Sequence, residues 1–214
     1  MNFHDLKRVP RQWIADDLAA LSDRYVHIRR AVSRCGIPHF TPRKANFHTL
    51  VALIVEQQIS VRAARAILLR LEDYLPSMTP DEILRSKDQD LRSVGLSSQK
   101  VNYLRDLSAH VADGRLDIAA MRKMDDAAIE AHLTRVKGIG RWSAENFMIF
   151  ALERRNIWPA GDIILQEGMR KIKKLADRPN IKQTDIIGAR YAPYRTAMAL
   201  LGWHFHEGTK FLAK

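Results

Sequence analysis

Apolar residues recur three and four positions apart along most of the chain, which is the spacing of one face of an α-helix. No segment alternates apolar and polar residues for long enough to predict a β-strand, and we find no internal repeat or long linker. The sequence therefore predicts an all-α protein built from many short helices. The expected helices cover about residues 14–33, 46–56, 60–71, 97–111, 125–133, 142–152, 162–175 and 193–206.

Small polar residues stand where several of these helices would begin, as is typical of helix N-caps. Residues 142–152 are apolar on most faces of the predicted helix, which indicates that this helix lies centrally. The expected N-caps are Ser60, Ser97 or Ser98, and the Asp125–Asp126 pair.

The composition adds a strong positive charge to this picture. The 214 residues include 35 Lys and Arg against 24 Asp and Glu, which gives a formal net charge of +11. Because 46% of the residues are hydrophobic, the chain can bury a core and is not a disordered basic tail. Such a surplus favours nucleic acid as a partner, with an acidic membrane surface or no charged partner as alternatives.

The one cysteine, Cys35, excludes an internal disulfide and any cysteine-ligated zinc site or iron–sulfur cluster within the chain. No apolar run approaches the length that spans a bilayer, and the first residues have no apolar signal core. We therefore expect a cytoplasmic protein, associated with the nucleoid if it is bacterial.

The most informative segment is the turn between two predicted helices, with the sequence VKGIGR at 136–141. Gly138 and Gly140 permit positive φ angles and a close backbone approach. Gly140 stands just before a helix, where backbone N–H groups and the helix dipole bind phosphate. Lys137 and Arg141 add positive charge there, and Ile139 can fill the angle between the helices. An ordinary turn with a glycine cap is the alternative.

Residues 133–144, with the sequence LTRVKGIGRWSA, resemble the helix-hairpin-helix of the DNA glycosylase superfamily. The chain is most similar to the 3-methyladenine DNA glycosylase II family, over roughly residues 46–208. The resemblance implies a two-lobed helical fold with the active site in the cleft between the lobes. It also implies that the hairpin grips the DNA backbone. The carbonyls of Thr134, Val136 and Ile139 would be able to hold a monovalent cation.

On this basis we expect three parts of the chain. Residues 1–45 would form an N-terminal helical segment that packs on the C-terminal lobe. Residues 46–135 would form a helical lobe with a wedge loop, and residues 136–214 would carry the hairpin and the catalytic Asp.

Asp162 follows Pro159 and stands near the start of a predicted helix, where an Asp is commonly an N-cap. The resemblance matches Asp162 to the essential Asp of the superfamily. Cleavage of an N-glycosidic bond develops positive charge on the sugar, and a fixed carboxylate either stabilises that charge or orients the attacking water. Because an alkylated purine is already cationic, it leaves with little acid catalysis, and one carboxylate suffices.

Related enzymes that also cut the DNA strand carry a Lys nucleophile at the position of Trp142. A Trp side chain cannot form a Schiff base, so the resemblance implies a monofunctional enzyme that leaves an abasic site. The resemblance implies no cofactor and no catalytic metal.

A polar interruption at 56–60 matches the loop that replaces an extruded base in these enzymes, with Gln58 or its neighbour Gln57 as the wedge. Lys100, in the sequence GLSSQK, also fits the family pattern as a phosphate contact. The alternative is a turn and N-cap with a solvated Lys.

Trp203 lies roughly opposite the apolar stripe of the last predicted helix, and the resemblance matches it to a Trp beside the catalytic Asp. An aromatic floor suits a cationic base. Trp142 is the second candidate wall of the base pocket, although a place in the hydrophobic core is the stronger alternative for it. Two features depart from the family. Asn146 stands where an aromatic residue is common, and no segment of this sequence reads as strands of the N-terminal β domain that the best-known bacterial form has.

The sequence thus predicts a monomeric DNA-3-methyladenine glycosylase II that acts on alkylated purines in double-stranded DNA. The alternatives are a glycosylase for an etheno, deaminated or oxidised base, or a non-catalytic helix-hairpin-helix DNA-binding module. Such a module has no use for an anion like Asp162 near phosphate. A membrane-surface protein would need a basic amphipathic helix, which the sequence lacks.

Overall fold

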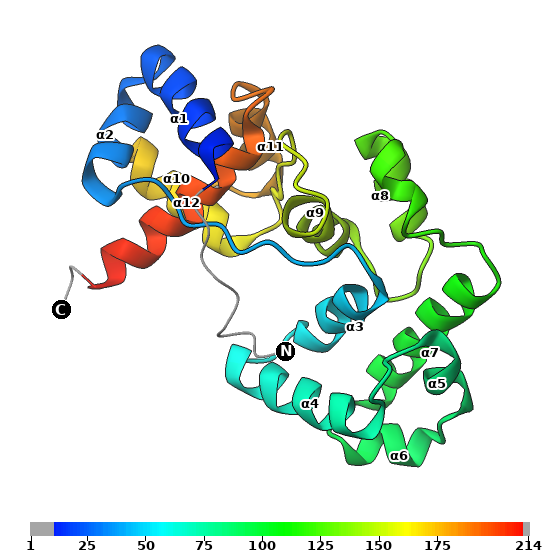
Figure 1. Cartoon of the computed structure of the whole chain (residues 1–214). Coiled ribbons are helices and arrows are strands. Elements are labelled where there is room, and N and C mark those ends of the chain that lie inside the picture. Colours follow the sequence, from blue (N-terminus) through cyan, green and yellow to red (C-terminus); the bar gives the residue numbers. More distant parts are fainter. Residues whose placement is uncertain (1–10, 212–214) are drawn as a thin grey trace. The chain divides into compact units, whose positions relative to one another are not determined.

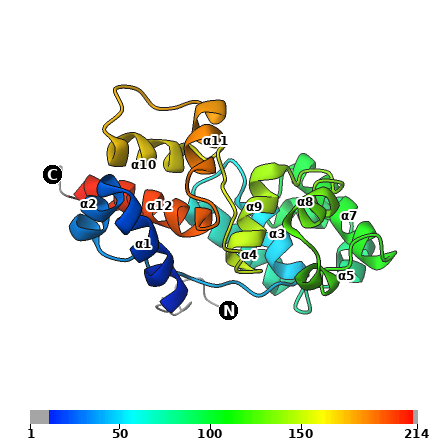
Figure 2. The same cartoon turned by 90° about the horizontal axis from the view of Figure 1, so that it is seen from above.

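The computed structural model describes residues 11–211, with side chains for residues 11–208. Within this range the chain is helical and forms no β-strand, as the sequence predicted (Figure 1). None of the described helices is long and apolar enough to cross a membrane. The helices, which Figure 2 shows from above, are α1 (Gln12–Arg24), α2 (Val26–Cys35), α3 (Phe47–Glu56), α4 (Val61–Tyr74), α5 (Pro80–Arg85), α6 (Asp88–Ser93), α7 (Ser98–Ala112), the 3-10 helix η1 (Ala120–Lys123), α8 (Asp126–Leu133), α9 (Arg141–Phe150), α10 (Ile163–Lys173), α11 (Ile181–Ala189) and α12 (Arg195–Phe211).

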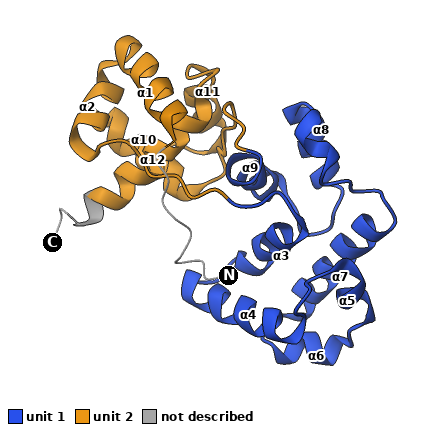
Figure 3. Cartoon of the chain, viewed as in Figure 1, with its two compact units in different colours: residues 1, 43–152 blue, residues 2–42, 153–214 orange. Residues whose placement is uncertain are grey.

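The described chain divides into two compact units (Figure 3). Unit 1 comprises residues 43–152, and unit 2 comprises residues 11–42 and 153–211. In unit 1, helix α3 is buried along almost its whole length and packs against α4, α7 and α9. In unit 2, α10 and α12 form the closest helix pair, and α1 and α2 pack against α12.

The boundary between the units differs from the expected division at residue 136. Helix α9 is buried from Ser143 to Ile149 and packs against α3 and α8. The hairpin and α9 therefore belong with the preceding helices, and the division falls after Leu152. The apolar residues of α9, which indicated a central helix, are indeed mostly buried.

The single helix expected over residues 14–33 is wrong, because the chain forms α1 and α2 with a break at Tyr25. The backbone of Tyr25 is extended, with φ −133° and ψ 108°. Its hydroxyl donates to the carbonyl of Arg190 at 3.0 Å, and its ring packs edge-on against Tyr191 with centroids 5.5 Å apart. These contacts, about 165 residues away in the sequence, interrupt a locally favourable helix.

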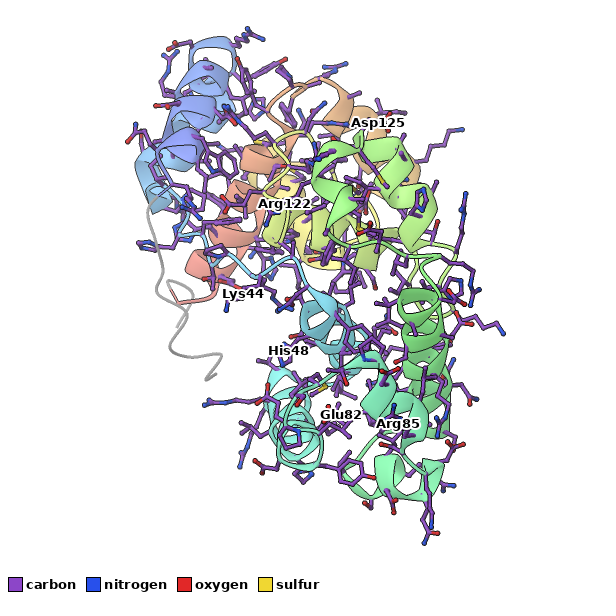
Figure 4. The ribbon with its side chains drawn as sticks, turned by 45° about the vertical axis from the view of Figure 1, so that its right-hand side comes forward. Lys44, His48, Glu82, Arg85, Arg122 and Asp125 are labelled. Atoms are coloured by element: carbon purple, nitrogen blue, oxygen red, sulfur yellow. The ribbon has the colours of Figure 1, made fainter. Side chains whose placement is uncertain are left out.

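Side-chain caps fix most helix starts. The expected caps Ser60, Ser97 and Asp125 each accept a hydrogen bond from the backbone N–H three residues later. The pattern did not predict the short helices α5, α6 and α11, which have six, six and nine residues. Helix α5 begins with a reciprocal capping box between Thr79 and Glu82. Figure 4 labels Glu82 and Asp125 at the starts of α5 and α8.

The N-terminal helices are held to the C-terminal segment by polar contacts inside unit 2. Asp17 is buried and pairs with the guanidinium of Arg155. The ring of His204 lies 2.7 Å from the carbonyl of Cys35, at the end of α2. Residues 11–42 therefore pack on the C-terminal helices, whereas the first ten residues of the expected N-terminal segment lie outside the described residues.

Candidate active site and nucleic-acid interface

Asp162 is held by two elements of unit 2. It caps α10, and its Oδ1 accepts a hydrogen bond from the N–H of Leu165 at 2.8 Å. The same oxygen accepts a second hydrogen bond from Nε1 of Trp203 at 2.9 Å. The N-cap interpretation is therefore correct, and the structure adds that Trp203, from α12, lies directly against this carboxylate.

The turn before Asp162 is fixed from both sides. Nε1 of the buried Trp158 donates to the carbonyl of Thr184 at 2.8 Å. The side chain of Gln166 reaches back and donates to the carbonyl of Ala160 at 2.8 Å. The N–H of Asp162 donates to the carbonyl of Pro159 at 2.9 Å. These hydrogen bonds hold the backbone that carries the carboxylate in one conformation, so the position of the carboxylate is defined in advance.

The close crossing of α10 and α12 brings Trp203 to Asp162. A Cβ atom on Gly168 would lie 2.1 Å from the carbonyl oxygen of Gly202, so the two backbones almost touch. Trp203 is the next residue along α12, and it is half-buried. Both glycines lie inside predicted helices, where a glycine often has a packing reason.

The hairpin joins α8 to α9 in unit 1 and has the expected conformation at its first glycine. Gly138 has φ +85°, and a Cβ atom there would lie 2.2 Å from the ring of Tyr103. The side chains of Val136 and Ile139 are buried. Ile139 therefore packs inside the angle between the helices, as its place between the glycines predicted.

The structure narrows the set of hairpin N–H groups that are able to bind phosphate. The N–H of Lys137 donates to Oδ2 of Asp106 at 2.8 Å, and that of Ile139 donates to the carbonyl of Val136 at 3.0 Å. In the described part of the chain, no acceptor takes the N–H groups of Gly138 and Gly140. These two groups are the hairpin donors that an anion could use.

The two basic side chains of the hairpin differ in their surroundings. Lys137 is exposed. Arg141 is also exposed, but its Nε donates to the carboxylate of the buried Glu145 at 2.9 Å. Part of the positive charge of Arg141 is thus balanced within α9.

The expected cation ligands lie in this same turn. The carbonyl of Val136 accepts from Ile139, and a carbonyl oxygen keeps a second lone pair. Carbonyl oxygens such as those of Thr134, Val136 and Ile139 suit a hard cation, and this cation site stays a prediction. Elsewhere in the described residues, no three His, Cys, Asp or Glu side chains gather as metal ligands.

The two wedge candidates have different environments. Gln57, which follows α3, is partly buried, and its amide donates to the carbonyl of Gly138 at 2.7 Å and to Oγ of Ser143 at 3.1 Å. Gln58 is exposed and has φ +56°, which is uncommon for a residue other than glycine. Of the two, Gln58 is therefore the side chain that the loop presents to solvent.

Lys100 does not project into solvent as a phosphate contact would. Its Nζ donates to the carbonyls of Val55 at 2.7 Å and Gln57 at 2.9 Å. Burial lowers the pKa of this ammonium group. Lys100 is therefore not the fully solvated Lys that the sequence offered as an alternative, because its ammonium group binds the end of α3. The phosphate contact stays a prediction.

Trp142 lies in the first turn of α9, in unit 1, and 38% of its surface is exposed. Its carbonyl accepts a hydrogen bond from the buried amide of Asn146 at 2.8 Å. The polar residue that departs from the family pattern is thus satisfied within its own helix. The role of Trp142 as a wall of the base pocket stays a prediction.

Comparison with known proteins agrees with this arrangement. A family model described as the HhH-GPD superfamily base excision DNA repair protein matches residues 51–192. DNA-3-methyladenine glycosylase 1 of Schizosaccharomyces pombe is 28% identical over 195 residues, which cover 87% of this chain and 83% of that protein.

Two solved structures are similar over most of the chain. The crystal structure of a DNA-3-methyladenine glycosidase from Bacillus halodurans has a TM-score of 0.79 and 30% identity, and the match covers 92% of this chain and 91% of the other. The 3-methyladenine DNA glycosylase of Schizosaccharomyces pombe, in complex with abasic DNA, has a TM-score of 0.79 and 25% identity. That match covers 91% of this chain and 97% of the other.

Proposed function

Because the chain belongs to the HhH-GPD superfamily of base excision DNA repair proteins, we propose that it is a monofunctional DNA-3-methyladenine glycosylase of type II. Its substrates would be alkylated purines in duplex DNA. The observation that carries this proposal is the carboxylate of Asp162, held in place by the start of α10 and by Trp203. The similar proteins named as 3-methyladenine glycosylases support the choice of substrate.

Asp162 would act on the deoxyribose of the damaged nucleotide. As the N-glycosidic bond breaks, the base leaves with the bonding electrons, and positive charge develops at C1′. The fixed carboxylate stabilises this charge and accepts a proton from the water that attacks C1′. The products are the free base and an abasic site in an intact strand.

The remaining site residues would bind the DNA. A base inside a duplex must be extruded before its glycosidic bond is accessible, and the exposed Gln58 would occupy the space that it leaves. The N–H groups of Gly138 and Gly140, with Lys137 and Arg141, would bind the phosphate backbone. Trp203 and Trp142 would contact the cationic base through their rings.

The first test is release of free bases from methylated duplex DNA by the full-length protein. We expect chromatography to show release of 3-methyladenine, with strand breaks only after alkali. We also expect that borohydride traps no covalent complex, since Trp142 has no amine for a Schiff base.

Each other outcome contradicts a defined part of the proposal. Strand breaks without alkali, or a trapped complex, would contradict a monofunctional enzyme. Release of only etheno, deaminated or oxidised bases would show that the substrates are not alkylated purines such as 3-methyladenine. DNA binding with no release of any base would leave a binding module.

A pair of glycine variants tests the phosphate contact of the hairpin. A Cβ atom on Gly140 meets no atom within 4 Å, so Gly140→Ala should change the free energy of unfolding by less than about 1 kcal/mol. The added methyl would stand where phosphate approaches, and we expect about tenfold weaker binding to duplex DNA, comparable to one charge-assisted hydrogen bond.

Gly138→Ala serves as the contrast, because a Cβ atom there clashes with Tyr103 and φ is +85°. It should lower the free energy of unfolding by more than about 2 kcal/mol. Binding isotherms measure the DNA affinity of both variants, and urea unfolding measures their free energy of unfolding. Unchanged DNA affinity for a folded Gly140→Ala variant would exclude this N–H group as a phosphate ligand.

A further inference from the structure

We propose that Lys100 and Gln57 are positioning residues that hold Gln58 at a fixed place relative to the hairpin. This inference rests on the proposed function, in which Gln58 fills the gap left by the extruded base. In this proposal Lys100 has a role other than phosphate binding, and Gln57 is no longer a candidate for the wedge residue. All the contacts that carry it lie within unit 1.

The ammonium group of Lys100 closes the C-terminal end of α3. The last carbonyls of a helix have no partner within it and carry the negative end of the helix dipole. Lys100 binds one such carbonyl, that of Val55, at 2.7 Å, and also the carbonyl of Gln57 at 2.9 Å. A charged donor thus fixes the backbone on both sides of Glu56, where α3 ends two residues before Gln58.

The side chain of Gln57 connects this backbone to the hairpin. Its amide nitrogen donates both to the carbonyl of Gly138, at 2.7 Å, and to Oγ of Ser143, at 3.1 Å. An amide nitrogen has two N–H groups, and these two contacts use both of them. Both N–H groups of the Gln57 amide therefore already have acceptors within the protein. The loop is joined to the hairpin at Gly138, whose N–H is one of the two proposed phosphate donors.

Gln58 itself is held in a conformation that few residues adopt. Its φ of +56° is left-handed, and a residue in that region persists where its surroundings over-determine the backbone. Lys100 and Gln57 fix the chain before it, and Ser60 fixes the chain after it by capping α4 at 3.2 Å. The exposed side chain of Gln58 consequently projects from a loop that is pinned at both ends.

As a consequence, Gln58 and the hairpin N–H groups that would bind phosphate keep a fixed position relative to one another. A wedge that is already in place when the hairpin binds phosphate loses little freedom on insertion. If the loop were loosened, Gln58 would have to be ordered during base extrusion, and extrusion would become less favourable. The loss should be largest where the base is well paired.

The test compares two duplexes that differ only in how firmly the damaged base is held. Both carry one 7-methylguanine, placed opposite cytosine in the first duplex and opposite an abasic analogue in the second. An unpaired base is extruded at lower energetic cost. Lys100→Met and Gln57→Ala should slow single-turnover release from the paired duplex by about tenfold more than from the unpaired one, which corresponds to one lost hydrogen bond of this kind.

Three further variants of the full-length chain provide the controls. Lys100→Arg keeps a charged donor for the two carbonyls and should keep the wild-type ratio of the two rates. Lys123→Met removes the same charge from an exposed position and should also keep that ratio. In the Gln58→Ala background, Lys100→Met should cause no further loss, because Lys100 acts through Gln58.

Equal slowing on both duplexes, or an additive effect in the double variant, would overturn the proposal. Failure of the wild type to release the base from either duplex would contradict the proposed function instead. In that case the fluorescence of a 2-aminopurine placed next to the damaged base reports extrusion without chemistry. A rise with the wild type but not with Lys100→Met would then support the positioning role, and equal signals would refute it.

Discussion

Replacement of Asp162 by Asn is expected to abolish base release and to leave the fold unchanged. Asn caps a helix as well as Asp does, so the hydrogen bond to Leu165 survives. The amide oxygen also remains able to accept from Nε1 of Trp203. The substitution therefore removes the negative charge and the proton acceptor, and little else.

The expected loss in the single-turnover rate is at least about 100-fold, as is typical when a group that stabilises transition-state charge or transfers a proton is removed. Rates on methylated duplex DNA measure it, with circular dichroism and DNA affinity as checks on folding and binding. We expect the affinity for DNA to be unchanged or higher, because an anion close to phosphate has been neutralised.

Two other substitutions separate the catalytic role from the capping role. Asp125→Asn makes the same change at the exposed cap of α8 and should leave the rate unchanged. Asp162→Ala removes the cap as well as the charge and should cost about 1 kcal/mol of stability in addition. If Asp162→Asn retained the wild-type rate, Asp162 would be a structural cap and the proposed chemistry would lose its basis.

Gly168→Ala is expected to be the most destabilising of the glycine substitutions. The new Cβ atom would lie 2.1 Å from the carbonyl oxygen of Gly202 and 2.6 Å from its carbonyl carbon. Both atoms belong to the backbone, so no rotation of a side chain relieves the clash. Helices α10 and α12 would have to separate, which would expose the packed side chains between them and pull Trp203 away from Asp162.

We expect Gly168→Ala to lower the free energy of unfolding by more than about 3 kcal/mol. For a chain of this size that corresponds to a fall in the melting temperature of more than about 6 °C. Gly202→Ala is the matched control. The nearest atom to its added Cβ is Cδ1 of Leu165 at 2.8 Å, which belongs to a flexible side chain, so the loss should be smaller. Equal melting temperatures for the two variants would contradict the close backbone contact.

Features that depend on neighbours within about four residues could be predicted from the chain alone. The period of apolar residues, the caps at Ser60, Ser97 and Asp125, and the glycine turn at Gly138 are of this kind. A cap or a turn involves atoms that covalent geometry already keeps close, so residue identity and spacing are enough to indicate it.

Apart from the short helices α5, α6 and α11, the features that escaped prediction depend on residues far apart in the chain. Tyr25 breaks a helix because of Arg190, and Lys100 binds carbonyls 43 and 45 residues away in the sequence. The local sequence GLSSQK is equally compatible with a Lys100 side chain that contacts phosphate, solvent or another part of the protein. Packing alone selects among these, since the burial that orients the side chain comes from other helices.

Asp162 shows how the two kinds of information combine. Its place after Pro159 at a helix start, together with the family resemblance, was enough to single it out from the sequence. Its second hydrogen bond, to Trp203, requires α10 and α12 to cross at Gly168 and Gly202. Local patterns thus locate the carboxylate along the chain. Its environment forms only when distant helices pack, and it could not be predicted because contacts between distant residues produce no periodic pattern in the sequence.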